Sequence, residues 1–98
     1  MKRLFISQPM RGKTDTEILK ERVFAIAKAQ ALTSEEIEVI GSFYNDFNPN
    51  AKPLEYLARS IEDLATADIA IFIGDWKNYR GCRIEHLCAV EYGIDRIE

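Results

Sequence analysis

Three apolar runs, each followed by a longer segment with helical periodicity, restrict the folds that this chain can adopt. The expected strands are 4–6, 38–44, 69–73 and a last short strand at 95–98. The expected helices lie between them, at 14–33, 53–65 and 83–92. A repeated strand–helix–strand order forms right-handed βαβ units, which place the strands parallel in one sheet. We therefore expect a three-layer α/β fold of the Rossmann or flavodoxin kind. Its short parallel sheet should have strand order 2-1-3-4, with helices on both faces.

Local signals mark where the helices begin and end. Thr14 and Glu17 have the spacing of a capping box, and Pro53 fits the first turn of a helix. Gly93 fits a stop just after the third helix. The residues expected to share one helix face are Leu19, Val23, Ile26 and Gln30 in the first helix, Leu54, Leu57, Ala58, Ile61, Leu64 and Ala65 in the second, and Ile84, Leu87 and Cys88 in the third.

Composition narrows the class of protein. The 98 residues are expected to form one domain, 1–98, and hydrophobic and charged shares of 47% and 30% are typical of soluble globular proteins. A net charge of −3 lacks the excess of basic residues that is typical of nucleic-acid-binding proteins. No apolar run approaches the roughly 20 residues of a membrane span. Cys82 and Cys88 point to different sides of the third helix, so we expect reduced thiols in a cytoplasmic protein.

The loops that follow the first three strands should all emerge at one edge of the sheet, where open α/β sheets bind ligands. These loops contain both basic and aromatic residues. The aromatic residues could stack on a nucleobase or simply cover the core. The basic residues, which could surround an anion or form a solvated rim, are Arg11, Lys13, Arg80 and Arg83. The aromatic residues are Tyr44, Phe47, Trp76 and Tyr79.

Glu85 is the first residue in which to look for chemistry. We expect it in the first turn of the third helix and off its core-facing stripe, where the helix dipole favours the ionised form. An ionised carboxylate suits attack on an electrophilic carbon such as the anomeric carbon of a sugar. The alternative is a glutamate that only offsets the dipole. His86, with Cys82 and Cys88, matches no usual zinc spacing, and we expect it to be exposed or at an interface.

At this point the sequence resembles a known family. The stretch 81–89, Gly-Cys-Arg-Ile-Glu-His-Leu-Cys-Ala, is similar to the pattern around the nucleophilic glutamate of nucleoside 2-deoxyribosyltransferases. Ala67-Asp68 before an apolar strand also matches, and 6–12, Ile-Ser-Gln-Pro-Met-Arg-Gly, resembles the first loop of that family. The whole chain looks closest to a compact bacterial and phage branch of this superfamily, which is related to 2′-deoxynucleoside 5′-monophosphate N-hydrolases.

The resemblance implies that Glu85 attacks the anomeric carbon of a 2′-deoxynucleoside or its monophosphate, with Ser7 and Arg11 near the sugar 5′ end. It also implies a homodimer or higher homo-oligomer, because the family commonly completes each site with a neighbouring subunit. Tyr79 and Ser60 stand where family members carry aspartates. The Tyr79 departure favours hydrolysis over base exchange, but transfer of the sugar to another base stays open. Ser60 and Tyr79 together leave a non-catalytic nucleotide-binding domain as the alternative.

We therefore predict a site with Glu85 as the catalytic residue, no metal and no cofactor. The partner should be a small nucleoside or nucleotide, not a nucleic acid or a membrane. The predicted substrate-binding residues are Ser7, Gln8, Pro9, Met10, Arg11, Gly12, Tyr44, Ser60, Asp75, Trp76 and Gly81.

Overall fold

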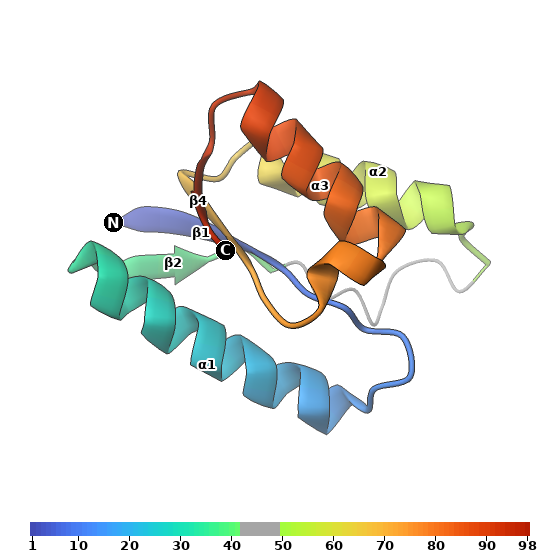
Figure 1. Cartoon of the computed structure of the whole chain (residues 1–98), viewed down its shortest axis with the longest axis horizontal. Helices are drawn as coiled ribbons and strands as arrows, with labels where there is room; N and C mark the ends of the chain where they lie inside the picture. The colour runs from blue at the N-terminus through green and yellow to red at the C-terminus, as the bar shows by residue number, and fades with distance from the viewer. Residues whose placement is uncertain (42–49) are drawn as a thin grey trace.

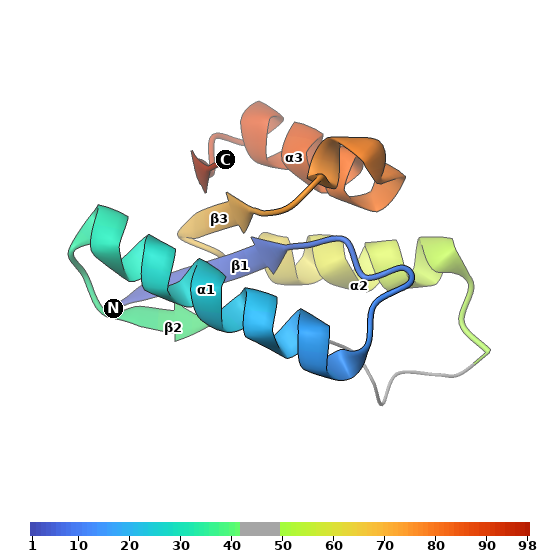
Figure 2. The ribbon, with the colours of Figure 1, turned by 60° about the horizontal axis from the view of Figure 1, so that its bottom comes forward.

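The computed structural model describes residues 1–41 and 50–98, which form a parallel sheet with helices on both faces (Figures 1 and 2). The sheet has the order β2-β1-β3-β4, so the expected fold class and strand order are confirmed. Its strands are β1 (Lys2–Ser7), β2 (Ile37–Val39), β3 (Ile69–Phe72) and β4 (Asp95–Ile97). The helices are α1 (Asp15–Thr33), α2 (Pro53–Leu64) and α3 (Arg80–Glu91), and a 3-10 turn, η1 (Trp76–Asn78), precedes α3.

The strands divide their side chains between two cores. Leu4 and Ile6 of β1 face α1, whereas Phe5 between them faces α2 and α3. This alternation is the two-residue period of a strand, and it makes both faces of the sheet apolar. α1 therefore covers one face, and α2 and α3 cover the other (Figure 1).

Two boundaries differ from the expectation. β2 ends at Val39, and residues 42–44 of the strand expected at 38–44 lie outside the described residues. α3 begins at Arg80 rather than at 83, because η1 ends at Asn78 and the carbonyl of Tyr79 already accepts the amide of Arg83. Glu85 is therefore in the second turn of α3, and its expected first-turn position is wrong.

The expected faces of α1 and α3 are also wrong. α1 buries Ile18, Arg22, Ala25 and Ala29, and α3 buries Cys82, Glu85 and Ala89. The larger apolar residues Leu19, Val23, Ile84 and Leu87 are exposed instead. Small side chains at Ala25, Ala29 and Ala89, all fully buried, let both helices approach the sheet closely, and apolar spacing alone does not reveal this. The bounds of α2 agree with the expectation, but its expected face is only half right. Leu64 is buried and Leu57 and Ile61 are half-buried, whereas Leu54, Ala58 and Ala65 are exposed.

The predicted start and stop signals at Thr14, Pro53 and Gly93 are confirmed. The Thr14 side chain accepts the amide of Glu17 at 3.2 Å, and Glu17 Oε1 accepts the amide of Thr14 at 3.1 Å. This reciprocal pair is a capping box. Pro53 is the first residue of α2, and Gly93 has a φ of +69° just after α3.

Replacing the cap should cost stability without changing the fold. We expect Thr14→Ala to lower the free energy of unfolding by about 1 kcal/mol, because the amide of Glu17 loses the hydroxyl group that accepts its hydrogen bond. For a domain of this size, that corresponds to a melting temperature lower by roughly 4–8 °C. Thr16→Ala, an exposed change in the same turn, is the control for chemical denaturation. Equal losses in the two variants would contradict the capping role.

Candidate functional site

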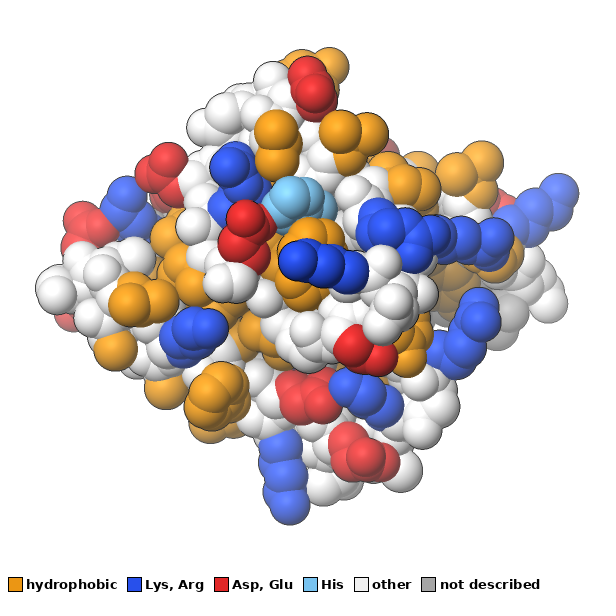
Figure 3. All heavy atoms as spheres, viewed as in Figure 1, with side chains coloured by type: hydrophobic (Ala, Val, Ile, Leu, Met, Phe, Trp, Pro, Cys, Tyr) orange, Lys and Arg blue, Asp and Glu red, His pale blue; other side chains and the backbone are white. Residues whose placement is uncertain are grey.

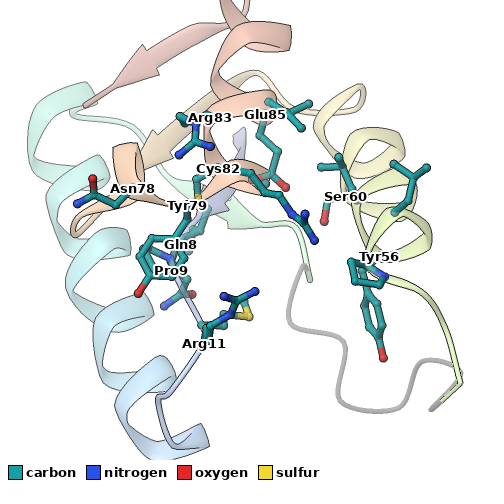
Figure 4. A pocket seen from close by; sticks show the side chains of 18 of the residues that line it. Gln8, Pro9, Arg11, Tyr56, Ser60, Asn78, Tyr79, Cys82, Arg83 and Glu85 are labelled. Carbon is teal, nitrogen blue, oxygen red and sulfur yellow. The ribbon is translucent and has the colours of Figure 1, made fainter.

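A broad cleft opens at the carboxyl edge of the sheet (Figure 4). The loop after β1 contributes Gln8, Pro9, Met10 and Arg11, α2 contributes Tyr56, Leu57 and Ser60, and the start of α3 contributes Tyr79, Arg80, Gly81, Cys82, Arg83, Ile84 and Glu85. Asp75 and Lys52 also line the cleft. The cleft thus lies where the topology of an open parallel sheet predicts a ligand site.

Glu85 is held between two hydroxyl groups. Ser7, the last residue of β1, donates from Oγ to Glu85 Oε1 at 2.6 Å. Ser60 of α2 is a second hydrogen-bond partner of the carboxyl group. The Glu85 side chain is 8% exposed, so it forms part of the floor of the cleft rather than its rim. Figure 4 shows the Glu85 side chain next to Ser60, and both residues line the cleft.

Burial is the largest influence on the pKa of Glu85. Removal from water raises the pKa of the carboxyl group above its ordinary value, and the hydrogen bonds from Ser7 and Ser60 lower it only in part. The expectation that the helix dipole favours the ionised form is therefore wrong. The second-turn position and the buried side of α3 make desolvation the larger effect.

The thiol of Cys82 shares the floor with Glu85. Burial raises its pKa, while a hydrogen bond with Ser7 lowers it and the nearby Glu85 raises it further. The Ser7 hydroxyl therefore links the carboxyl group and the thiol. Cys82 and Cys88 are free cysteines, as their helical spacing predicted.

Positive charge gathers at the rim of the cleft. Arg11, Lys52, Arg80 and Arg83 line it, against the carboxylates of Asp75 and Glu85. The N-terminus of α3 has no side-chain cap and no acidic residue in its first turn, whereas α1 has Asp15 and Glu17 and α2 has Glu55. Free amides at a helix N-terminus attract anions, and cations there are locally unfavourable. The start of α3 is therefore suited to a bound anion.

The structure gathers some of the predicted binding residues and separates others. Gln8, Pro9, Met10, Arg11, Ser60, Asp75 and Gly81 line the cleft, and Ser7 reaches Glu85. Gly12 turns the first loop at a φ of +78° and is not among the described lining residues. Tyr44 lies outside the described residues.

Trp76 is part of the core instead of the cleft lining. It is 9% exposed and packs against Phe72 and His86, with ring centroids 5.3 Å and 4.5 Å away. His86 is half-buried beside Trp76 and pairs with Glu98. Within residues 1–41 and 50–98, no group of three or more His, Cys, Asp and Glu side chains is arranged to hold a metal ion.

Several residues at or behind the site were not predicted from the sequence, Tyr56 and Arg22 among them. Tyr56 lines the cleft from α2, and its position one turn before Ser60 was the signal that could have found it. Arg22 lies behind the first loop and contacts Gln8. No local signal marks Arg22, because a charged residue within an amphipathic helix is normally exposed.

Comparisons with models of protein families, with curated proteins and with solved structures found no match to this chain. None of the helices that the structure describes is both long enough and apolar enough to cross a membrane.

Because burial raises the pKa of Glu85, its ionisation should destabilise the folded protein. The native state favours the protonated form, so stability is highest below the ordinary value of 4.5 and falls as the pH rises through the raised pKa. Glu85→Gln cannot ionise, and we expect it to be more stable than the parent by on the order of 1 kcal/mol at pH 8. The gain should shrink towards pH 4, as measured by urea unfolding across this range.

Glu91→Gln is the matched control, since it changes an exposed glutamate on the same helix. It should show little gain at either pH. A gain for Glu85→Gln that does not change between pH 4 and pH 8 would argue against a raised pKa.

Proposed function

We propose that this protein hydrolyses the N-glycosidic bond of a 2′-deoxynucleoside 5′-monophosphate, with Glu85 as the nucleophile. The proposal includes membership of the nucleoside 2-deoxyribosyltransferase-like superfamily, in its compact branch. It also includes a cytoplasmic location, which the free thiols of Cys82 and Cys88 favour. The observation that carries it is the Glu85 carboxyl group, buried at the floor of a cleft whose rim is cationic.

The orientation of Glu85 supports a nucleophilic role. The Ser7 hydroxyl fixes Oε1, and Ser60 holds the carboxyl group from the side of α2. A fixed carboxylate loses little freedom when it approaches a sugar, which lowers the barrier to attack. The desolvation that raises its pKa also leaves the ionised form poorly solvated and therefore reactive.

The reaction then has two steps. An oxygen of Glu85 forms a bond to C1′ while the bond from C1′ to the base nitrogen breaks, and the base leaves with the bonding electrons and takes a proton from solvent. Water next attacks C1′ and releases the Glu85 carboxylate, a proton and deoxyribose 5-phosphate. No residue beyond Glu85 forms a covalent bond in this scheme.

The rim supplies a place for the phosphate. Arg11 on the first loop and Arg80 at the start of α3 lie on the cleft lining, together with the free amides of that helix. Guanidinium groups bind phosphate through paired hydrogen bonds, and a helix N-terminus adds to the attraction. This arrangement favours a monophosphate over a free nucleoside.

A second candidate function is nucleotide binding without catalysis. Ser60 offers a hydroxyl where a second carboxyl group could protonate the leaving base. The raised pKa of Glu85 also reduces the ionised fraction that can attack. A domain that only binds nucleotides would use the same cationic rim and cleft. Neither the missing second carboxyl group at Ser60 nor the raised pKa of Glu85 would impair it.

Release of free base distinguishes the two functions. We expect the protein to liberate base from at least one of the 2′-deoxynucleoside 5′-monophosphates, as followed by chromatography. Glu85→Gln should lower that rate by at least about a thousandfold, because it removes the nucleophile. The variant should still be stabilised against heat by the same nucleotide.

Glu91→Gln is the control and should keep full activity. Thermal stabilisation of the parent without release of base would support the binding function. No effect of any nucleotide, either on stability or on base release, would contradict both.

We also propose that the protein forms a homo-oligomer through the outer face of α3. Ile84, Leu87 and Val90 are exposed there, and Figure 3 shows hydrophobic side chains gathered over this helix. These residues lie on the same helix as Glu85, so a second subunit bound to them would come close to the cleft. Apolar patches of this kind commonly mark protein interfaces.

Sedimentation of two matched variants tests this face. We expect Leu87→Lys to shift the protein towards the monomer, because the lysine would lie in an apolar contact. Leu19→Lys places the same change on the exposed face of α1 and should leave the assembly intact. A monomeric parent would contradict the proposal, and dissociation by Leu19→Lys alone would move the interface to α1.

A further inference from the structure

Arg22 is a buried charge that the proposed reaction does not use. It lies on the sheet-facing side of α1 with Ile18 and Ala25, and it is only 7% exposed. Removing a guanidinium group from water is costly, and replacing a buried charge with a well-packed apolar residue is often neutral or stabilising. The reason for a cation here is therefore to be sought in the groups that it holds.

The guanidinium group joins the ends of two neighbouring strands. Its Nη1 donates to Gln8 Oε1 at 3.1 Å, and its Nη2 donates to the carbonyl of Ile40 at 3.4 Å. Gln8 is the first residue after β1, and Ile40 is the first after β2. Both strands end at the edge of the sheet that carries the cleft. From its position on α1, Arg22 therefore holds the end of β1 next to the end of β2.

Gln8 is held from its amide side as well. Its Nε2 donates to Glu21 Oε1 and to the carbonyl of Ile18, both at 3.3 Å. Glu21 Oε2 in turn accepts Lys13 Nζ at 2.7 Å. A guanidinium group can only donate and a carboxylate can only accept, so one orientation of the Gln8 amide satisfies both neighbours.

These contacts fix both ends of the first loop. Between Gln8 and Lys13, the chain turns at Gly12, and the amide of Lys13 donates to the carbonyl of Met10 at 3.2 Å. Arg11 projects from this turn, and Figure 4 shows it below Gln8 at the cleft. Arg22 is not among the described lining residues, so it would act on a ligand indirectly, and Gln8 is the partner that connects it to the lining.

We propose that Arg22 is a positioning residue, which holds Gln8 so that the loop 8–13 presents Arg11 to the phosphate of a bound nucleotide. The identity of the ligand rests on the proposed function. The ordering of the loop by Arg22 does not rest on the proposed function, because the mobility of the loop can be measured without turnover.

The test compares Arg22→Met and Arg22→Lys with Ala25→Gly. Methionine keeps the bulk but donates no hydrogen bond, and lysine keeps the charge but lacks the planar fork. Ala25→Gly destabilises the same buried face of α1 without removing a contact to Gln8. Each variant is examined by thermal unfolding, by hydrogen exchange of the amides of residues 10–13, and by calorimetric titration with a deoxynucleoside monophosphate and the matching free deoxynucleoside.

We expect Arg22→Met to melt no lower than Ala25→Gly, yet to exchange the loop amides about tenfold faster. Its affinity for the monophosphate should fall about tenfold, the factor that one lost charge-assisted hydrogen bond represents. Affinity for the free deoxynucleoside should change much less. Arg22→Lys should have a loop exchange rate and a monophosphate affinity between those of the parent and Arg22→Met. If Arg22→Met does not fold, the comparison of Arg22→Lys with Ala25→Gly is the test.

Loop exchange and monophosphate affinity that match those of Ala25→Gly would overturn the positioning role. Equal losses of affinity for the monophosphate and the free deoxynucleoside would also overturn it, because they would indicate a general structural effect. If the parent binds no nucleotide, the proposed function fails, and the exchange of residues 10–13 alone decides whether Arg22 orders the loop.

Discussion

The hydrogen bond from Ser7 to Glu85 joins residues that are 78 positions apart and brings β1 and α3 together at the floor of the cleft. A buried carboxyl group is tolerated only when hydrogen-bond donors surround it. Ser7 must therefore lie at the end of β1, and Glu85 must face it from the buried side of α3. Ala89, one turn further along α3, then packs into the core with no exposed area. The orientation of α3, and with it the cationic start of that helix, depends on this contact.

Much of the fold could be predicted because its signals are local. The capping box at Thr14 and Glu17, Pro53 at the start of α2 and Gly93 after α3 each depend on neighbours only a few residues away. The sheet order follows from the alternation of strands and helices, because right-handed crossovers leave few arrangements. The same order brings the loops that hold Gln8 and Asp75 to one edge, where both line the cleft.

The helix faces could not be predicted, because tertiary contacts decide them. α1 turns Leu19 and Val23 to the outside and packs Ala25 and Ala29 against the sheet. Apolar spacing favoured the larger side chains, whereas close approach to a twisted sheet favours small ones. The charge of Glu85 was misjudged for the same reason. Its burial depends on the α3 face that meets β1, and the helix dipole is a weak effect beside desolvation.

Several local rules of stability are broken at the edge of the sheet that carries the cleft. Glu85 and Arg22 are buried, and α3 begins with Arg80 and Arg83 instead of an acidic residue. Conflicts that gather in one place indicate a binding function, because a ligand can relieve them. A phosphate at the start of α3 would neutralise the arginines, but the same charge beside Glu85 would raise the pKa of its carboxyl group further. Under the proposed function, a nucleotide would therefore bind with its phosphate at the rim and its sugar at the floor, with the anomeric carbon, rather than the phosphate, next to Glu85.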